Sequence, residues 1–243
     1  MLFLKSTAKE IDIMVDTAIL VGNIATDDVK AIANRIVDII ISPNIIPGLI
    51  NIALSVPLDL GYLAVGYFDT DSRFAHQTQR IRVAEAIHND ILNYEHIANA
   101  VGKTFEKFDR YLTISQQDNV YRSVVSSVAG RLSTAKIISS IGAAVLARVS
   151  FIGAKSANNW IGRVTMLLLV GGMTERSIGV SEALAIKAPE IYQLLRPHDY
   201  DLTYFLFEPA VEPFVEAIHI ANTLGQPYFN KMIEIVESKL NAH

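Results

Sequence analysis

Hydrophobic residues recur along this chain at the three- and four-residue spacing that marks one face of an α-helix. The strongest apolar stretch is Leu132–Met173, in which two apolar arms, Leu132–Ala154 and Ile161–Met173, flank a polar tip at 155–160. The first arm has one branched aliphatic face, made of Ile138, Ile141, Val145, Val149 and Ile152. Its opposite face is small and consists of Ser139, Ser140, Ala143, Ala147 and Ser150. The pattern predicts a hydrophobic helical hairpin at the centre of the fold.

Charged residues interrupt both arms of this hairpin. A helix that crosses a bilayer needs about 20 largely uncharged residues. No uncharged run inside the hairpin exceeds 11 residues, because of Lys136, Arg148, Lys155, Arg163 and Glu175. The second arm is nevertheless apolar on every side over 164–172, which is typical of a buried helix. Two interpretations follow: the hairpin stays in the core of a soluble helical domain, or it leaves that core for a membrane.

Capping residues, prolines and polar turns divide the rest of the chain into further helices. Thr7 and Glu10 have the spacing of a capping box, and Thr26 precedes Asp27 at the start of another helix. Pro189 is expected to kink or break its helix. We expect helices at 8–21, 27–41, 48–56, 58–68, 73–101, 104–112, 177–195, 209–224 and 227–241, and one that leads from 118 into the first arm. The two at 48–56 and 58–68 are read as a second apolar hairpin, buried or membrane-seeking, because the uncharged run 39–58 contains prolines that break it.

Two of these segments carry expectations about side-chain direction and conformation. The long helix at 73–101 has its inward candidates at Ile81, Ala84, Ile87, His88, Ile91 and Ile97. Leu202–Phe207 has strand propensity, but a lone strand would have no partner, so this stretch is expected to be helical or irregular. No repeat, linker or break in composition divides the chain. We therefore predict a single all-α domain over 1–243, with roughly nine to eleven helices.

Composition narrows the classes of partner. Apolar residues make up 51% of the chain and charged residues 19%, against about 25% charged in a typical globular protein. The net charge of −4 and the lack of a basic block argue against a nucleic-acid partner. The chain has no cysteine, which excludes disulfides and thiolate metal sites. The N-terminus lacks the pattern of a cleavable signal peptide, and the localisation stays open.

One short pattern could carry metal chemistry. Glu85 and His88 have the same Glu-x-x-His spacing as Glu216 and His219, a spacing found in di-iron helix bundles. Such bundles also need a glutamate on each of two other helices, and no glutamate lies between Glu10 and Glu85. We expect no metal at these residues and no cofactor. Neither a phosphate-binding glycine loop nor a Gly-x-Ser-x-Gly elbow occurs, so we do not expect an enzyme.

The hairpin Leu132–Met173, with its Ser/Ala/Gly-rich segment Ile137–Ala147, resembles the pore-forming domain of colicins and similar membrane-permeabilising effectors of bacterial competition. It departs from that family in having Arg148 and Arg163 inside the arms and 70 residues after them. The resemblance implies a soluble form that buries the hairpin, an inserted form in a lipid membrane, and a cognate immunity protein. The residues expected to enter or meet the membrane are Ile138, Ile141, Val145, Arg148, Val149, Ile152, Trp160, Arg163, Leu167, Leu168 and Leu169.

Trp160 is compatible with that expectation independently of the family, since an indole flanked by cations suits a headgroup interface. The alternative, which base rates favour, is a surface or sub-surface aromatic that seals a helix turn. Two hypotheses about function follow. In the first, the protein is a membrane-active toxin or effector that inserts the hairpin. In the second, it is a soluble helical scaffold or adaptor that binds a protein partner through an apolar groove.

Overall fold

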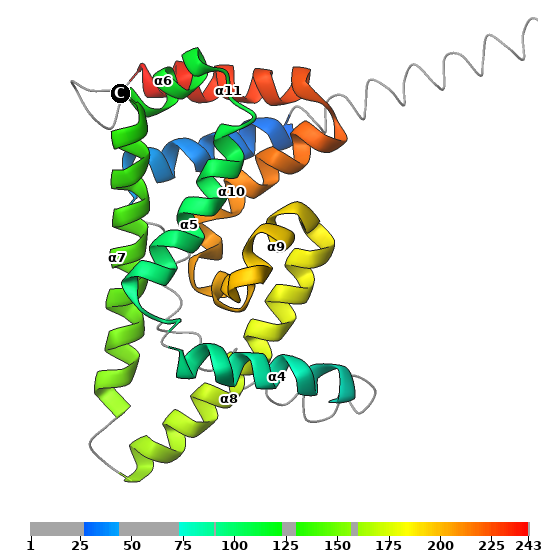
Figure 1. Ribbon diagram of the computed structural model, residues 1–243. Helices are drawn as coiled ribbons and strands as arrows, with labels where there is room; N and C mark the ends of the chain where they lie inside the picture. The colour runs from blue at the N-terminus through cyan, green and yellow to red at the C-terminus, as the bar shows by residue number, and fades with distance from the viewer. Residues whose placement is uncertain (1–26, 44–72, 90, 123–129, 157–159, 243) are drawn as a thin grey trace, which may run out of the picture.

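The computed structural model describes residues 27–43, 73–89, 91–122, 130–156 and 160–242; at 73–76, 130–133, 148–156 and 160–172 it describes the backbone alone. Every regular element in these residues is a helix, which confirms the all-α class (Figure 1). The elements are a helix at 27–41, α4 (Arg73–His88), α5 (Tyr94–Asp109), α6 (Ile114–Arg122), α7 (Gly130–Ser156), α8 (Trp160–Lys187), α9 (Pro189–Leu195), the 3₁₀ turns η2 (Arg196–His198) and η3 (Tyr200–Thr203), α10 (Tyr204–Thr223) and α11 (Gln226–Leu240). The helices predicted at 8–21, 48–56 and 58–68 lie outside the described residues.

The centre of the fold is α10, which runs between α5 and α11 (Figure 1). Twelve of its 20 residues are buried. The ring of Phe214 lies 4.5 Å from the ring of Phe105 and 5.1 Å from that of Phe108, the latter edge-on. Aromatic side chains bury large areas and favour such tilted pairs. The helix 27–41 adds Ile36 and other buried residues to the same core, as its stripe of apolar residues indicates.

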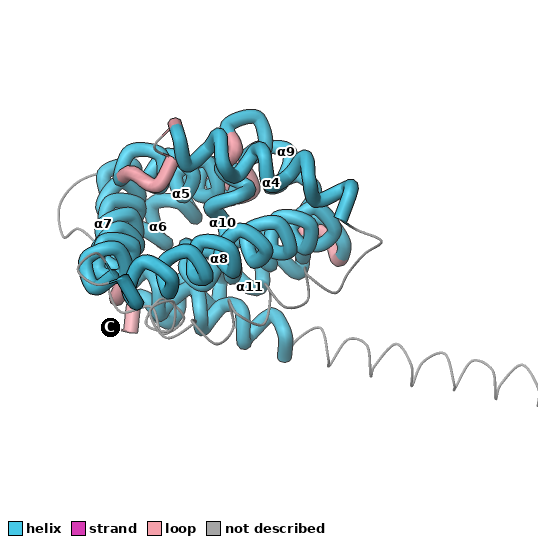
Figure 2. Tube along the Cα trace, turned by 90° about the horizontal axis from the view of Figure 1, so that it is seen from below, coloured by secondary structure: helices cyan, strands magenta, loops and turns pink. Residues whose placement is uncertain are grey.

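The predicted central hairpin is not what the structure shows. α7 and α8 are both long helices, but they diverge from their ends near 156 and 160 and do not lie side by side along their length (Figures 1 and 2). α7 packs along α5 instead. Of the segments 137–154 and 163–172, which were expected to be the most buried, only the side chains at 137–147 are described. Among the described side chains, α10 has twelve buried residues and 137–147 has four.

The described part of α7 buries the face that its sequence predicts. Ile137, Ile141 and Val145 are buried, whereas Ala143 and Ala147 on the small face are exposed. The close approach to α5 occurs at Gly142, where a Cβ atom would lie 3.3 Å from Cε2 of Tyr94. Small residues thus permit one tight helix contact, but that contact is with α5 and not with the second arm of the predicted hairpin.

α8 continues through the position where a new helix was expected. Its helix runs from Trp160 to Lys187 without a break, so the separate start predicted at 177 is wrong. No glycine or proline interrupts the polar run 174–177, and its polar groups find partners inside the fold: Glu175 accepts from Arg80 and Ser177 donates to Leu202. The predicted break at Pro189 is confirmed, because α8 ends at Lys187 and Pro189 is the first residue of α9.

The helix predicted at 73–101 is two helices. α4 ends at His88, and α5 begins after Asn93, whose Oδ1 accepts from the backbone N–H of His96 at 2.9 Å. An asparagine in this position is a favoured cap. α5 then continues to Asp109, so the separate helix predicted at 104–112 is also wrong, and α6 begins at Ile114, before the start predicted at 118.

This break reverses the predicted orientation of α4. Val83 and Ala86 are its buried residues, whereas four of the six inward candidates, Ile81, Ala84, Ile87 and His88, are exposed. The other two, Ile91 and Ile97, lie after α4 and are buried as predicted.

The strand-prone stretch 202–207 forms the end of η3 and the start of α10, as expected for a segment with no strand partner. A helix satisfies its backbone groups internally, which an isolated strand in a core could not do. α10 therefore begins at Tyr204, and Pro209 and Pro213 lie inside it and not at its first turn. The last helix, predicted at 227–241, is confirmed as α11.

Candidate functional site

An apolar pocket lies between α4, the residues that follow it, α8, and the junction of η3 with α10. We call it the α4–α8 pocket. Its volume is about 230 Å³. One wall comes from Val83, Ala86 and Ile87 of α4 with Ile91 and Leu92; the other comes from Met173, Thr174 and Ser177 of α8 with Leu202, Thr203 and Phe205.

The hydroxyl groups in this wall are engaged within it. Ser177 Oγ donates to the backbone oxygen of Leu202 at 2.5 Å, and Thr203 Oγ1 donates to the backbone oxygen of Tyr200 at 3.0 Å. The surface that these residues offer to the pocket is therefore almost wholly carbon. A pocket of this kind binds uncharged apolar groups and supplies no acid, base or nucleophile.

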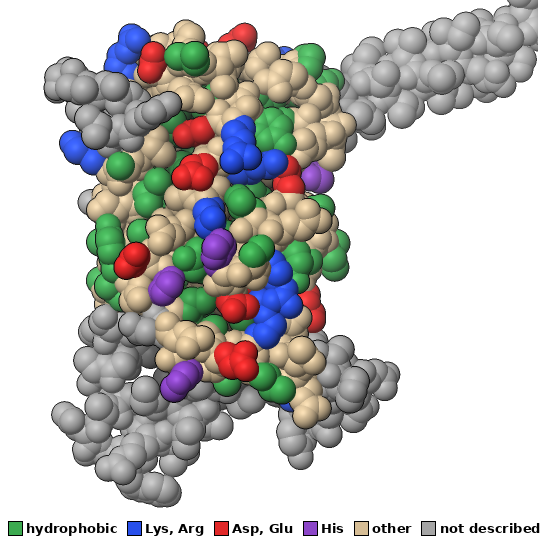
Figure 3. Space-filling view, in the orientation of Figure 1, with side chains coloured by type: hydrophobic (Ala, Val, Ile, Leu, Met, Phe, Trp, Pro, Cys, Tyr) green, Lys and Arg blue, Asp and Glu red, His purple; other side chains and the backbone are tan. Residues whose placement is uncertain are grey.

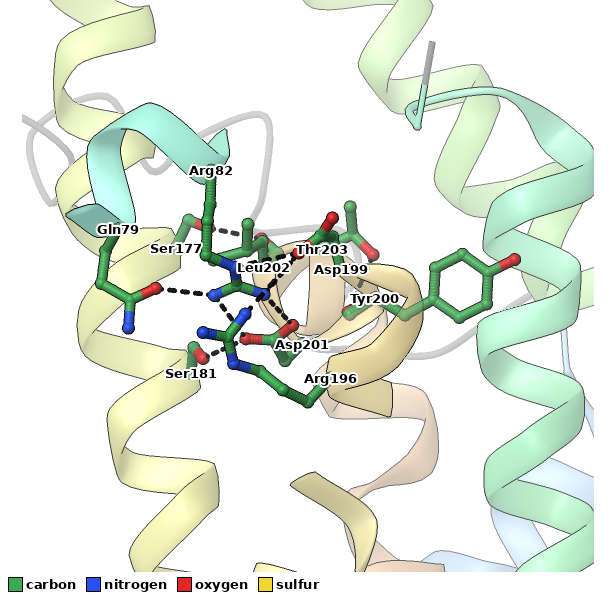
Figure 4. A network of polar contacts seen from close by, with 10 residues as sticks. All are labelled: Gln79, Arg82, Ser177, Ser181, Arg196, Asp199, Tyr200, Asp201, Leu202 and Thr203. Atoms are coloured by element: carbon green, nitrogen blue, oxygen red, sulfur yellow. Dashed lines mark hydrogen bonds and ion pairs between the residues drawn. The ribbon is translucent and has the colours of Figure 1, made fainter. Parts of the chain in front are cut away.

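A partly buried ion-pair network, the Arg82 network, lies beside the pocket (Figure 4). Nε and Nη2 of Arg82 donate to Oδ1 of Asp199 at 2.9 and 2.6 Å, and Nη2 also donates to Oδ1 of Asp201 at 2.9 Å. Nη1 donates to Oε1 of Gln79 at 2.6 Å and to Oδ2 of Asp201 at 3.3 Å. Ser181 Oγ donates to Oδ2 of Asp201 at 2.7 Å. The network connects α4 to α8 and η3, the elements of both pocket walls.

Asp201 is fully buried, and burial raises the pKa of its carboxyl group. The hydrogen bond from Ser181 and the charge of Arg82 oppose that rise, whereas neighbouring Asp199 adds to it. Two carboxylates beside one guanidinium make a site in which the loss of Arg82 would leave a buried charge without a cation. Such a group is costly, so Arg82 holds these elements together.

Asp199 reaches Arg82 through an unusual backbone conformation. Its φ of 58° is in the left-handed region, between η2 and η3. Aspartate tolerates this region better than most residues. The turn places the carboxylate toward Arg82 and also 3.6 Å from Nη1 of Arg196.

Histidines flank the next residue, Tyr200. The Nδ1 atom of His96 lies 3.2 Å from the tyrosine hydroxyl, and the ring of His198 stacks at 5.2 Å between centroids. Within the described residues, no three histidine or carboxylate side chains are grouped so that they could hold a metal ion. On the face shown in Figure 3, basic, acidic and histidine side chains are interspersed, and no patch of one charge stands out.

The paired Glu-x-x-His residues lie on α4 and α10. Glu85, His88 and His219 are exposed, and Glu216 accepts a hydrogen bond from Arg35 at 2.8 Å. Glu216 is therefore the partner of a cation, and the repeated spacing reflects two ordinary helix surfaces.

The residues expected to enter a membrane are divided between α7 and α8. Ile141 and Val145 are buried and Ile138 packs against the core. Arg148, Val149 and Ile152 belong to the second half of α7, Trp160 is the first residue of α8, and Arg163 and Leu167, Leu168 and Leu169 follow in α8, where the backbone alone is described. Among the helices that the structure describes, none combines the length and apolar character needed to cross a bilayer.

The sequence analysis missed both the pocket and the Arg82 network. The apolar pattern places Ile81 and Ala84 on the inward face of α4, whereas the structure buries Val83 and Ala86, which line the pocket. The network left one signal: Asp199 and Asp201 stand two residues apart just before the strand-prone stretch 202–207, and two such carboxylates need a cation. That cation comes from a residue 117 positions away from Asp199, which spacing alone does not reveal.

Comparison with known proteins finds no match to this arrangement: no protein-family model matches the sequence, and no curated protein or solved structure does so either.

Proposed function

We propose that this protein is a helical adaptor that binds a protein partner by taking one of the partner's apolar side chains into the α4–α8 pocket. The observation that supports this proposal is the almost purely carbon lining of a pocket of about 230 Å³. A cavity of about 150 Å³ already holds benzene, whereas pockets for drug-sized ligands measure about 300 to 1,000 Å³. The volume suits one large side chain better than a complete small-molecule ligand.

The surroundings of the pocket favour binding over catalysis. Arg82 pairs with Asp199 and with Asp201, and the hydroxyls of Ser177 and Thr203 donate to backbone oxygens. Ile87 lines the pocket and is 47% exposed, so it offers apolar surface to a bound chain at the rim. A buried apolar anchor surrounded by partly exposed apolar surface is the usual anatomy of a peptide-binding site.

A cavity-filling pair of variants tests the adaptor proposal. Peptides selected from a displayed random library on the immobilised protein are titrated against Ala86→Leu and Ala84→Leu. Ala86 lines the pocket, whereas Ala84 is exposed on the same helix. We expect Ala86→Leu to weaken binding about tenfold to a hundredfold, the value of burying one large apolar side chain, and Ala84→Leu to leave it unchanged. Peptides that bind both variants equally would exclude the pocket as the site.

A second candidate function, the membrane-active effector, rests on the arrangement of α7 and α8. The ends of these helices near 156 and 160 project together at the end of the molecule away from α6 and α11 (Figure 1). In this hypothesis Trp160 and Arg163 meet the lipid headgroups, and a cognate immunity protein protects the producing cell. Arg148 and Arg163 oppose insertion, because each costs about 2.5 to 3.5 kcal/mol at the middle of a bilayer, less when it snorkels.

Dye release from anionic phosphatidylglycerol vesicles separates the two functions. The effector hypothesis predicts leakage by the wild-type protein and faster leakage by Arg148→Leu, since that change removes a barrier to insertion and hardly alters helix propensity. If neither protein releases dye while Arg148→Leu keeps its helical circular dichroism, the effector hypothesis is excluded and the adaptor proposal stands alone.

A further inference from the structure

Over the described side chains, 77–88, α4 contacts the rest of the molecule more through charged groups than through buried apolar ones. Among its described side chains only Val83 and Ala86 are buried, and Ile81 and Ile87 are 54% and 47% exposed. By contrast, α10 buries twelve residues. A helix with so few buried apolar contacts belongs to the part of a fold that opens most readily.

The charges on α4 reach the elements that form the opposite wall of the pocket. Nε of Arg80 donates to Oε1 of Glu175 on α8 at 2.7 Å. Arg82 pairs with Asp199 and with the fully buried Asp201 (Figure 4). These ion pairs fix the position of α4 against α8 and η3. Because α4 forms one wall of the pocket, its position determines whether the pocket is closed on the α4 side.

We propose that α4 is a gate: it opens and closes the α4–α8 pocket as a unit, and the Arg82 network holds it shut. This proposal rests on the proposed function, because a gate matters only if the pocket takes a ligand. Opening returns Arg82 and Asp201 to water, and the hydration that they regain offsets much of the ion-pair attraction that they lose. The free energy of opening is therefore much smaller than the number of ion pairs suggests.

The end of α4 provides the pivot. Ile91, three residues after the end of α4, is buried and donates its backbone N–H to the backbone oxygen of Ala86 at 3.0 Å. Asn93 caps α5 immediately afterwards. The chain is thus held at Ile91 and Asn93, and opening is a rotation of α4 about these residues.

The absence of native cysteine permits a direct measurement of this opening. Single variants Ala86→Cys, Ala84→Cys and Ala217→Cys are treated with a maleimide on a polyethylene glycol chain too large to enter the pocket. Position 86 lies on the buried face of α4 and position 84 on its exposed face. Position 217 lies in the core, on α10. We expect labelling to be fast at 84, slower at 86 and slowest at 217.

Arg82→Lys then tests the role of the network. It keeps the positive charge but loses the planar donor groups that reach both aspartates. We expect Arg82→Lys to speed labelling of Ala86→Cys about tenfold and to leave the rates of Ala84→Cys and Ala217→Cys unchanged. Arg80→Met, which removes the ion pair with Glu175 of α8, provides a second variant if Arg82→Lys does not fold.

Two results would overturn the gate. If Ala86→Cys and Ala217→Cys react at the same rate and respond equally to Arg82→Lys, position 86 is exposed only by global unfolding. If Ala86→Cys reacts as fast as Ala84→Cys without a second change, α4 is not held shut. The peptide titration with Ala86→Leu is independent of these rates. A selective effect of Arg82→Lys together with unchanged peptide binding would therefore reject the adaptor function and retain the opening of α4.

Discussion

Tyr121 donates its hydroxyl hydrogen to Oδ1 of Asp109 at 2.6 Å and so ties α6 to the last residue of α5. Burial raises the pKa of Tyr121 above its ordinary value, and the hydroxyl stays protonated as a donor. Burial also raises the pKa of Asp109 to about 6; the bond from Tyr121 opposes this rise and the charge of Glu106 adds to it. The position of Asp109 at the negative end of α5 acts in the same direction as burial.

This pair predicts how stability depends on pH. Asp109 binds its proton more tightly in the folded protein than in the unfolded chain, where its pKa is 3.8. Asp109 therefore lowers the free energy of unfolding at pH 7. As the pH falls from 7 through 6 toward 4 this penalty disappears, and the free energy of unfolding rises by up to about 3 kcal/mol. Urea unfolding at pH 7 and pH 5 should show this gain in the wild type and much less of it in Asp109→Asn, which keeps an acceptor for Tyr121. Equal pH dependence in the two proteins would contradict the prediction.

The contact at Gly142 predicts a second effect. A Cβ atom there would lie 3.3 Å from Tyr94 Cε2 and 3.5 Å from Ala98 Cβ, and the Tyr94 hydroxyl is held by a hydrogen bond to Ser139. Gly142→Val should force α7 away from α5 and reduce the free energy of unfolding by about 1 to 3 kcal/mol. Ala143→Val is the matched control, because position 143 is exposed. Valine is a better helix former than glycine, so a loss in Gly142→Val cannot come from helix propensity. Urea unfolding that shows no loss in Gly142→Val, or a loss no larger than that in Ala143→Val, would contradict the prediction.

The features that the sequence predicts well are local ones. The helix at 27–41 follows from its apolar stripe, the buried face of α7 from its branched residues, and the break at Pro189 from the missing N–H of proline. The lack of a strand at 202–207 follows from the need for a partner. Each of these inferences depends on residues within about two helical turns of one another.

The features that it does not predict depend on distant residues. Asn93 stands inside a periodic apolar pattern, so its role as a cap is visible only once α4 and α5 are seen to separate. The polar run 174–177 can stay inside α8 because Arg80 and the backbone of Leu202 satisfy it. The apolar pattern predicts the centre at the most apolar segment, but the element with twelve buried residues among the described side chains is α10, which packs on α5 and α11.

The attachment of the helix 27–41 to α10 predicts a salt-dependent effect. Arg35 lies 2.8 Å from both Glu212 and Glu216, and Lys187 pairs with Glu212 at 2.8 Å. These side chains are partly exposed, so Arg35→Met should reduce the free energy of unfolding by no more than about 1 kcal/mol, and less at high salt. Urea unfolding in low and in 1 M sodium chloride measures this. A loss that is equal at both salt concentrations would show that packing of the arginine stem, and not its charge, stabilises the helix.

The same cluster predicts a pH dependence opposite to that of Asp109. Although burial opposes ionisation, the hydrogen bond and charge of Lys187 and the charge of Arg35 lower the pKa of Glu212. Its contribution is therefore present above the unfolded pKa of 4.5 and is lost as the pH falls below that value. In Glu212→Gln the decline in stability below pH 4.5 should be shallower than in the wild type, and a steeper decline would contradict the prediction.

The position of α10 at the centre of the fold is tested by truncating its central ring. Phe214 is fully buried and packs on Phe105 and Phe108 of α5, so Phe214→Ala removes a large side chain from the contact between α10 and α5. We expect a loss of about 3 to 5 kcal/mol in the free energy of unfolding. Ile186→Ala on α8 removes a side chain that is 85% exposed and should change stability by no more than about 0.5 kcal/mol. We expect the loss of stability in Val145→Ala on α7 to lie between these two values, because Val145 is buried but smaller than Phe214. If Val145→Ala costs more than Phe214→Ala in urea unfolding, the α7 segment and not α10 carries the core, as the apolar pattern alone predicts.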